Sequence, residues 1–193
     1  IARDGIRAER FANLPDQAEA RHQIGWSKDL FVVGYVGRLQ TLSMDKGVGA
    51  LVDALAQVEG AALALVGGPD DMAQALRQRW LALGQDESRF LYAGHVPAER
   101  VPLYLAAFDV CALPSPWTPF FAYYTSPMKL FEYMVSRRPI VASDLPSNAE
   151  VVAHGESALL VPPGDAAAIA AAVRKLRDDP GLRERLAGQA HEL

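Results

Sequence analysis

Apolar positions along this chain follow two patterns that alternate. Short, continuous apolar runs rich in branched and aromatic residues predict buried strands at 31–37, 62–68, 89–93, 110–113, 139–142 and 158–161. Between them, apolar residues recur three or four positions apart, which predicts helices at 48–55, 70–83, 98–107, 126–136, 147–153, 166–177 and 181–193. Strands that are apolar throughout and alternate with helices are typical of a parallel sheet covered on both faces. The sequence therefore predicts an α/β fold with a doubly wound, Rossmann-like parallel sheet.

The length of 193 residues suits one domain with one core. We divide it into a lead-in segment at 1–28, a core at 29–165 and C-terminal helices at 166–193. The chain opens at Ile1 without a signal peptide, so we expect a piece of a longer protein. No apolar stretch approaches the roughly 20 residues that span a bilayer.

Cysteine content and charge exclude further classes. Cys111 is the single cysteine, which rules out an intramolecular disulfide, and its apolar surroundings predict an inert buried thiol. The net charge of −4 argues against a protein that mainly binds nucleic acid. Local basic clusters still suit the phosphates of a small molecule.

The carboxyl ends of the predicted strands are where ligands should bind, because doubly wound sheets hold ligands outside those ends. Five such ends carry glycine, proline or polar residues: Gly37-Arg38, Gly67-Gly68-Pro69, Gly94-His95, Pro114-Ser115 and Ser143-Asp144. We expect the functional residues there.

The segment 126–134 is the first candidate site. Ser126 is predicted as the N-cap of a helix, with Pro127 at its first position. Free N–H groups, the helix dipole and Lys129 would form an anion site, and Glu132 lies one turn deeper on the same face. Taken alone, the spacing favours the alternative, an exposed salt bridge between Lys129 and Glu132.

A second candidate follows the first strand. Gly37 allows a sharp turn, and Arg38 with Lys46 places two cations at the binding edge, as a pyrophosphate requires. A plain surface loop is the alternative. Gly67 and Gly68 either let a ligand approach the backbone or make a tight turn.

Known cofactor and metal motifs are missing from the sequence. It contains no GxGxxG, Walker A or HExxH pattern and no paired Cys or His residues, so we predict neither a cofactor nor a metal. Asp70-Asp71 suits the first turn of a helix better than a metal site.

Taken in order, these motifs resemble the C-terminal domain of GT-B glycosyltransferases of family 4, the group 1 glycosyl transferases. The ordered set covers nearly the whole chain and comprises 34–38, Lys46-Gly47, Gly67-Gly68, 94–96, Pro114-Ser115, 126–134, 139–146 and 150–152. Asp4-Gly5-Ile6 and Arg10-Phe11 resemble the segment that leads into this domain.

The resemblance implies a two-domain, metal-independent enzyme that retains anomeric configuration, with its active site between the domains. This domain would hold a nucleoside-diphosphate sugar, and an N-terminal domain of the same longer chain would shape the acceptor site. By resemblance, Arg38 and Lys46 bind the diphosphate and Glu132 the ribose hydroxyls. Backbone groups of Gly94, His95 and Val96 would contact the base, and those of Ser126, Pro127, Met128 and Lys129 would face the sugar and phosphates.

One departure concerns the family's E-x7-E element. Its first glutamate falls at Tyr124, which at that position is counted among the donor-binding residues. Lys129 is expected to take over part of the donor contact, and the identity of the donor sugar stays open. The same loop, 114–125, carries Trp117, Phe120, Phe121 and Tyr123. It either packs against the N-terminal domain or a lipid-linked acceptor, or folds over its own domain.

Two rival functions share the predicted fold. One is a nucleotide-sugar 2-epimerase, which matches the 126–134 segment less well; the other is a non-catalytic nucleotide-binding domain. The chain by itself is expected to bind donor without turnover. The family setting implies a cytoplasmic, bacterial hexosyltransferase of polysaccharide or glycolipid assembly, and it leaves open peripheral membrane contact by the longer protein.

Overall fold

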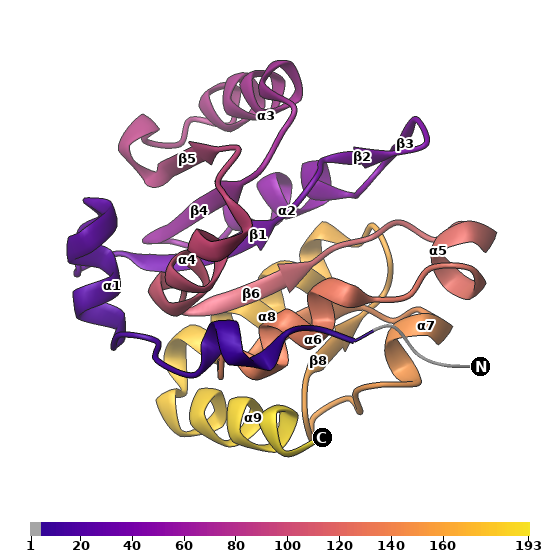
Figure 1. The fold of residues 1–193 in the computed structure, drawn as a ribbon. Coiled ribbons are helices and arrows are strands. Elements are labelled where there is room, and N and C mark those ends of the chain that lie inside the picture. The colour runs from indigo at the N-terminus through magenta and orange to yellow at the C-terminus, as the bar shows by residue number, and fades with distance from the viewer. Residues whose placement is uncertain (1–4) are drawn as a thin grey trace.

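The computed structural model describes residues 5–193 and contains a six-stranded parallel sheet (Figure 1). Its strands are β1 (Phe31–Val36), β4 (Ala61–Val66), β5 (Phe90–Gly94), β6 (Val110–Leu113), β7 (Ile140–Ser143) and β8 (Leu159–Val161). They lie in the order β5-β4-β1-β6-β7-β8. The chain thus moves outward from β1 to one edge, returns to β6, and continues to the other edge. The predicted doubly wound α/β fold is confirmed, and its topological switch point lies between β1 and β6.

Helices cover both faces of the sheet. The first face carries α2 (Val48–Leu55), α3 (Asp70–Ala82) and α8 (Ala166–Asp178), and the second carries α4 (Val101–Ala107) and α6 (Met128–Val135). α9 (Pro180–Glu192) contacts α6 and α8, while α1 (Gln17–Ile24) packs outside α4. Short 3₁₀ helices occupy Ala8–Phe11, Glu87–Arg89 and Ala98–Arg100. No helix of residues 5–193 has both the length and the apolar character needed to cross a bilayer.

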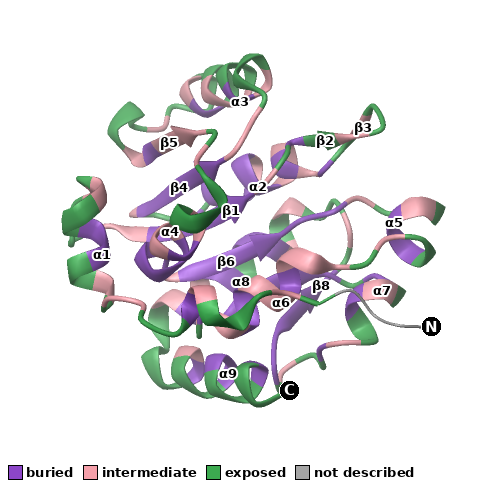
Figure 2. Cartoon of the chain, viewed as in Figure 1, coloured by how far each residue is buried: buried purple, intermediate pink, exposed green. Residues whose placement is uncertain are grey.

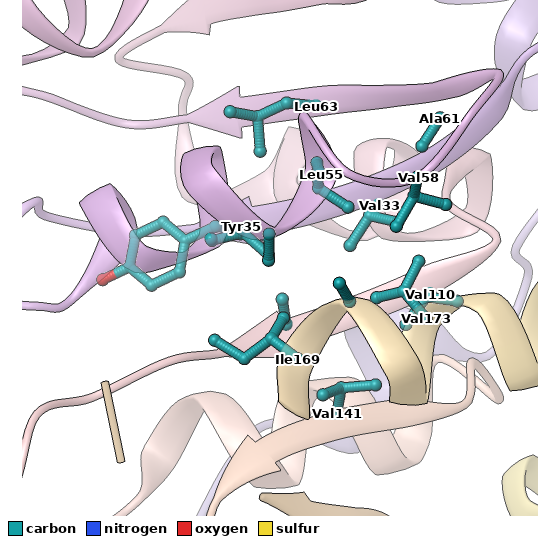
Figure 3. Close-up of a cluster of buried hydrophobic side chains, with 14 of the residues drawn as sticks. Val33, Tyr35, Leu55, Val58, Ala61, Leu63, Val110, Val141, Ile169 and Val173 are labelled. Atoms are coloured by element: carbon teal, nitrogen blue, oxygen red, sulfur yellow. The ribbon is translucent and has the colours of Figure 1, made fainter. Parts of the chain in front are cut away.

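The strands are buried on both sides, as Figure 2 shows for the centre of the sheet. In β1, Val33 and Tyr35 join the core cluster under α2 and α8, part of which Figure 3 shows. Val32 and Val36 point the other way, into the cluster under α4 and α6. Because successive side chains alternate between faces, a strand between two helical layers must be apolar throughout. Cys111 is fully buried, and burial raises the pKa of its thiol to about 12, in agreement with the predicted inert thiol.

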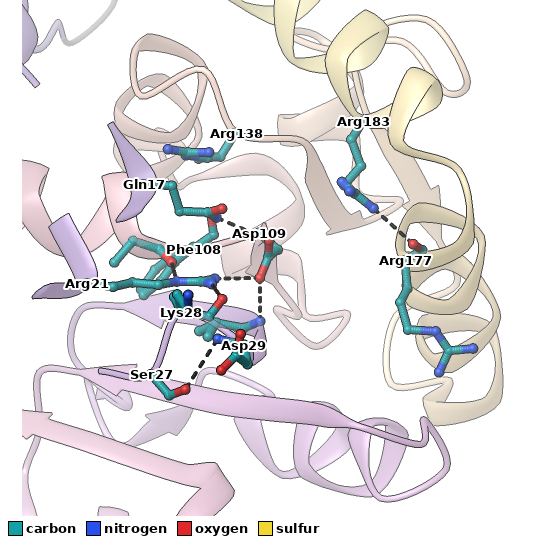
Figure 4. A network of polar contacts seen from close by, with 12 residues as sticks. Gln17, Arg21, Ser27, Lys28, Asp29, Phe108, Asp109, Arg138, Arg177 and Arg183 are labelled. Carbon is teal, nitrogen blue, oxygen red and sulfur yellow. Dashed lines mark hydrogen bonds and ion pairs between the residues drawn. The ribbon is translucent and has the colours of Figure 1, made fainter. Parts of the chain in front are cut away.

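The lead-in segment is tied to the sheet by a buried ion pair (Figure 4). The Arg21 guanidinium contacts Asp109 at 2.6 Å and also donates to the carbonyl groups of Ala107 and Lys28, each at 2.9 Å. The Asp109 carboxylate in turn accepts the backbone N–H of Val32 at 2.6 Å. Helix α1 is therefore bound to the starts of β1 and β6. Asp4, which the sequence groups with this segment, lies outside the described residues.

One predicted helix start is wrong. Ser126 is not the N-cap, and Pro127 is not the first helical residue, because α6 begins at Met128 with Pro127 as its cap. Pro127 has φ −81° and ψ 60°, and the Met128 N–H bonds to the Ser126 carbonyl at 2.9 Å. This is an inverse γ-turn, and it delays the helix by one residue and uses one of the N–H groups expected to be free.

Two small elements were not predicted from the sequence patterns. The hairpin of β2 (Gln40–Thr41) and β3 (Met44–Asp45) turns through Leu42 and Ser43, both at positive φ, where glycine or asparagine is the usual signal. Helix α5 (Pro119–Tyr123) lies in the loop 114–125, which we call the aromatic loop. Thr118 caps this helix by accepting the Phe121 N–H at 3.1 Å. Helix α7 (Pro146–Ala149) is shorter than the helix predicted at 147–153.

Candidate functional site

A cavity of about 230 Å³ opens at the carboxyl edge of the sheet, enclosed by the aromatic loop, α6 and α7. Among the predicted site residues it brings together Lys46, Ser126, Pro127, Met128 and Lys129. The rest of its lining is neutral and consists of Tyr35, Leu113, Ser115, Phe121, Thr125, Leu145, Ser147 and Asn148.

The two lysines give this first cavity its electrostatic character. Lys46 is only 9% exposed, and burial, with a smaller contribution from Lys129, lowers its pKa to about 8. Burial also lowers the pKa of Lys129; the charge of Glu132 opposes this effect, and the charge of Arg38 adds to it. Both ammonium groups thus share one cavity whose described lining contains no carboxylate. Such a site stabilises a bound anion, because the anion relieves the repulsion between the cations.

Glycines at the strand ends let this arrangement form. Gly37 follows β1 at φ 130°, and a Cβ there would overlap the Lys129 side chain, which crosses above it. Gly67 follows β4 at φ 131°, and its Cβ would overlap the Gly37 carbonyl. Gly67 therefore serves close packing between neighbouring strand ends, and Gly37 leaves room for the Lys129 side chain of α6. Gly68, by contrast, lines a second cavity.

The second cavity, of about 680 Å³, lies at the ends of β1, β4 and β5, beneath the β2–β3 hairpin. It brings together Arg38, Gly68 and His95 of the predicted site, with Asp70 and Asp71 at the start of α3. The Tyr35 hydroxyl donates to the Arg38 carbonyl at 2.6 Å, and the Leu39 N–H bonds to the Gly68 carbonyl at 2.8 Å. These bonds fix the turn that carries Arg38.

The remaining predicted residues are dispersed. Gly94 ends β5 at φ 64°, and Val96 packs against the second core cluster. Burial raises the pKa of the Glu132 carboxyl, an effect that the charges of Arg10 and Lys129 partly oppose. Lys129 and Glu132 do not form an ion pair within residues 5–193, so the alternative of an exposed salt bridge is wrong. Tyr124 is 77% exposed and lines neither of the two cavities.

Sequence reasoning missed several lining residues. Ser115 was visible as a strand-end residue, and it is buried in the first cavity. Ser147 and Asn148 lie a few residues after the end of β7, and their residue types alone do not indicate that they line a cavity. The sequence identified Phe121 only as one of the aromatic residues of the loop and did not predict it as a lining residue. In the part of the chain that the structure describes, no group of three or more His, Cys, Asp and Glu residues is placed to hold a metal ion.

Comparison with protein families shows to which family the chain belongs. Residues 31–179 match the family described as glycosyl transferases group 1, and this range includes Lys46 and Lys129 of the first cavity and Arg38 of the second. The chain belongs to the group 1 glycosyltransferases. Its doubly wound sheet is the C-terminal, Rossmann-like half of their GT-B fold.

Two known proteins match over nearly all of the chain. An α-D-kanosaminyltransferase from Streptomyces kanamyceticus is 30% identical over 179 residues, which are 92% of this chain and 44% of that enzyme. Among solved structures, Anabaena HepE in complex with UDP and glucose has a TM-score of 0.81 and 28% identity, covering 98% of this chain and 50% of HepE.

A third comparison concerns the fold alone. The C-terminal domain of a group 1 glycosyltransferase, LpcC from Francisella tularensis, has a TM-score of 0.80 at 19% identity and is covered over 95% of its length. The chain itself spans about half the length of the curated relatives it matches, 44%, 56% and 43% for three of them.

Proposed function

We propose that this chain is the donor-binding domain of a retaining, metal-independent glycosyltransferase. The enzyme would transfer a sugar from a nucleoside-diphosphate sugar to a saccharide or lipid-linked acceptor. The observation that carries this proposal is the pair of crowded lysines, Lys46 and Lys129, in a carboxylate-free cavity beside the β1–β6 switch point. Arg38 acts on Lys129 from the adjoining cavity.

Each part of a nucleotide sugar has a matching set of residues in this proposal. The diphosphate lies between Arg38 and Lys46, with Lys129 beside it. The base occupies the second cavity, next to the backbone of Gly94, His95 and Val96, and the ribose hydroxyls reach Glu132. The sugar meets the neutral hydroxyl and amide groups of the first cavity, at the turn before α6. Tyr124, at the position of the family's first glutamate, would approach the donor sugar from outside the first cavity.

The same residues would promote the reaction through charge. As the bond to the anomeric carbon breaks, negative charge grows on the departing diphosphate, and cations already held in place stabilise it without reorganisation. Arg38 and Lys46 supply that charge from fixed positions. The acceptor half belongs to the longer protein that we propose, as relatives of about twice this length support. We also propose that this longer protein is cytoplasmic.

Calorimetric titration of this chain with UDP, GDP and ADP tests the proposal. We expect one of the three to bind clearly better than the others, and the UDP complexes of HepE make UDP the first to try. Uridine is the matched control, because it keeps the base and ribose but lacks the diphosphate that the lysines would bind. Failure of all three nucleotides to bind at millimolar concentration would contradict the proposal.

Binding of UDP should weaken as the pH rises above 8. The pKa of Lys46 is lowered to about 8, so the free site keeps this positive charge below pH 8 and loses it above. If only the charged form binds, the Kd of UDP rises up to about tenfold per pH unit between pH 8 and 9.5. Titration of the wild type and of Lys46→Met checks this, and equal slopes for both proteins would refute it.

A further inference from the structure

Phe121 faces the candidate diphosphate site from the aromatic loop. Its side chain is 3% exposed and lines the first cavity together with Lys46 and Lys129. The Lys46 Nζ lies 4.2 Å from the centroid of the Phe121 ring, well within the range of a cation–π interaction. The nearest aromatic ring to the other ammonium, that of Tyr35, is 5.9 Å from Lys129 Nζ.

The loop holds this ring firmly. The Phe121 carbonyl accepts a hydrogen bond from the Ser147 hydroxyl of α7 at 2.8 Å, and the Thr125 hydroxyl donates to the Phe120 carbonyl at 2.7 Å. Gly47, next to Lys46, has no room for a Cβ, because the Pro114 carbonyl at the start of the loop occupies that position. The start of the loop is thus packed against Gly47, and Phe121 in α5 lies against the Lys46 side chain.

Lys46 needs such a support. Its long side chain has four rotatable bonds, and Lys129 repels its ammonium group. None of the ion pairs within residues 5–193 involves Lys46. A carboxylate would fix the ammonium but would also cancel the charge that a diphosphate requires. An aromatic ring attracts the ammonium through its negative face and leaves its full charge available.

We propose that Phe121 is a positioning residue that holds the Lys46 ammonium group at the diphosphate subsite. This inference rests on the proposed function and extends it to the aromatic loop. Within that loop Phe121 therefore serves its own domain, while Trp117, Tyr123 and Tyr124 remain exposed on the outside. Phe121 acts through Lys46 and is assigned no contact with the donor.

A double-mutant cycle with UDP as the probe tests this role. Phe121→Leu keeps apolar volume but removes the ring, and we expect it to weaken UDP binding about tenfold at pH 7. In a Lys46→Met background the same change should have almost no further effect, because the ring then has no ammonium to hold. Phe121→Tyr keeps the ring and should restore binding to within about threefold of the wild type.

Controls separate positioning from folding. Tyr123→Leu removes an exposed aromatic residue from the same helix and should leave UDP affinity unchanged. Each variant is checked by thermal unfolding, and Phe121→Met replaces Phe121→Leu if the latter does not fold, since methionine fills irregular space well. An equal loss in the wild-type and Lys46→Met backgrounds, or no loss in either, would overturn the inference. If the wild type binds GDP or ADP instead of UDP, that nucleotide replaces UDP in the cycle, and failure of all three to bind would instead count against the proposed function.

Discussion

Arg38→Ala and Lys46→Ala are each expected to lower sugar transfer by the full-length enzyme about 100-fold, the usual scale for removing one preorganised electrostatic contact. Arg38 lines the second cavity, and Lys46 is buried in the first. Both charges would act on the departing diphosphate, whose negative charge is greater in the transition state than in the bound donor. The loss should therefore appear mainly in kcat, with a smaller change in KM.

A matched control exists on the far side of the domain. Lys175 is exposed on α8 and lines neither cavity, so Lys175→Ala should transfer sugar at the wild-type rate. Rates are measured at saturating and at limiting donor, which separates kcat from KM. Near-wild-type rates in both Arg38→Ala and Lys46→Ala would remove the diphosphate assignment, whatever nucleotide the chain binds.

Asp109→Ala should destabilise the domain by about 3–5 kcal/mol. The change leaves the Arg21 guanidinium, whose side chain is 4% exposed, buried without its counterion. It also removes the acceptor of the Val32 N–H at the start of the central strand. Urea unfolding followed by circular dichroism measures the difference, with the slope compared between variants to check for two-state behaviour.

Asp53→Ala is the matched control for this ion pair. Asp53 pairs with Arg79, whose side chain is 54% exposed, and surface pairs of this kind contribute about 1 kcal/mol or less. A cost of Asp109→Ala no larger than that of Asp53→Ala would show that α1 is not anchored in the way the structure indicates.

Most of the fold was predictable because its signals are local. A strand buried on both faces can be recognised in the sequence as a continuous apolar run, and all six strands of the sheet were predicted in this way. The β2–β3 hairpin was not, because Leu42 and Ser43 occupy positions where turn chemistry normally places glycine. Helix α5 is too short to be stable by itself, so its formation depends on tertiary packing that a sequence pattern does not show.

The site was predictable to the level of strand ends, because parallel strands bring their carboxyl ends to one edge. That rule placed Arg38, Lys46 and Lys129 near one another. It did not reveal that Lys46 is buried and Lys129 half-buried, since burial depends on the loop that covers them. The γ-turn at Pro127 was hidden for a similar reason, because Pro127 is equally acceptable as a cap and as a first helical residue.

The ion pair between Arg21 and Asp109 bears on where the halves of two such enzymes could be joined in a chimera. Its partners come from segments 88 residues apart in the chain, on either side of the sheet's starting strand. A chimera joined after residue 28 would receive Asp109 from one enzyme and α1 from another. The Asp109 carboxylate would then depend on the side chain that the foreign α1 places opposite it. Recombination that keeps the donor domain intact should therefore have its junction before α1, so that Arg21 and Asp109 are inherited together.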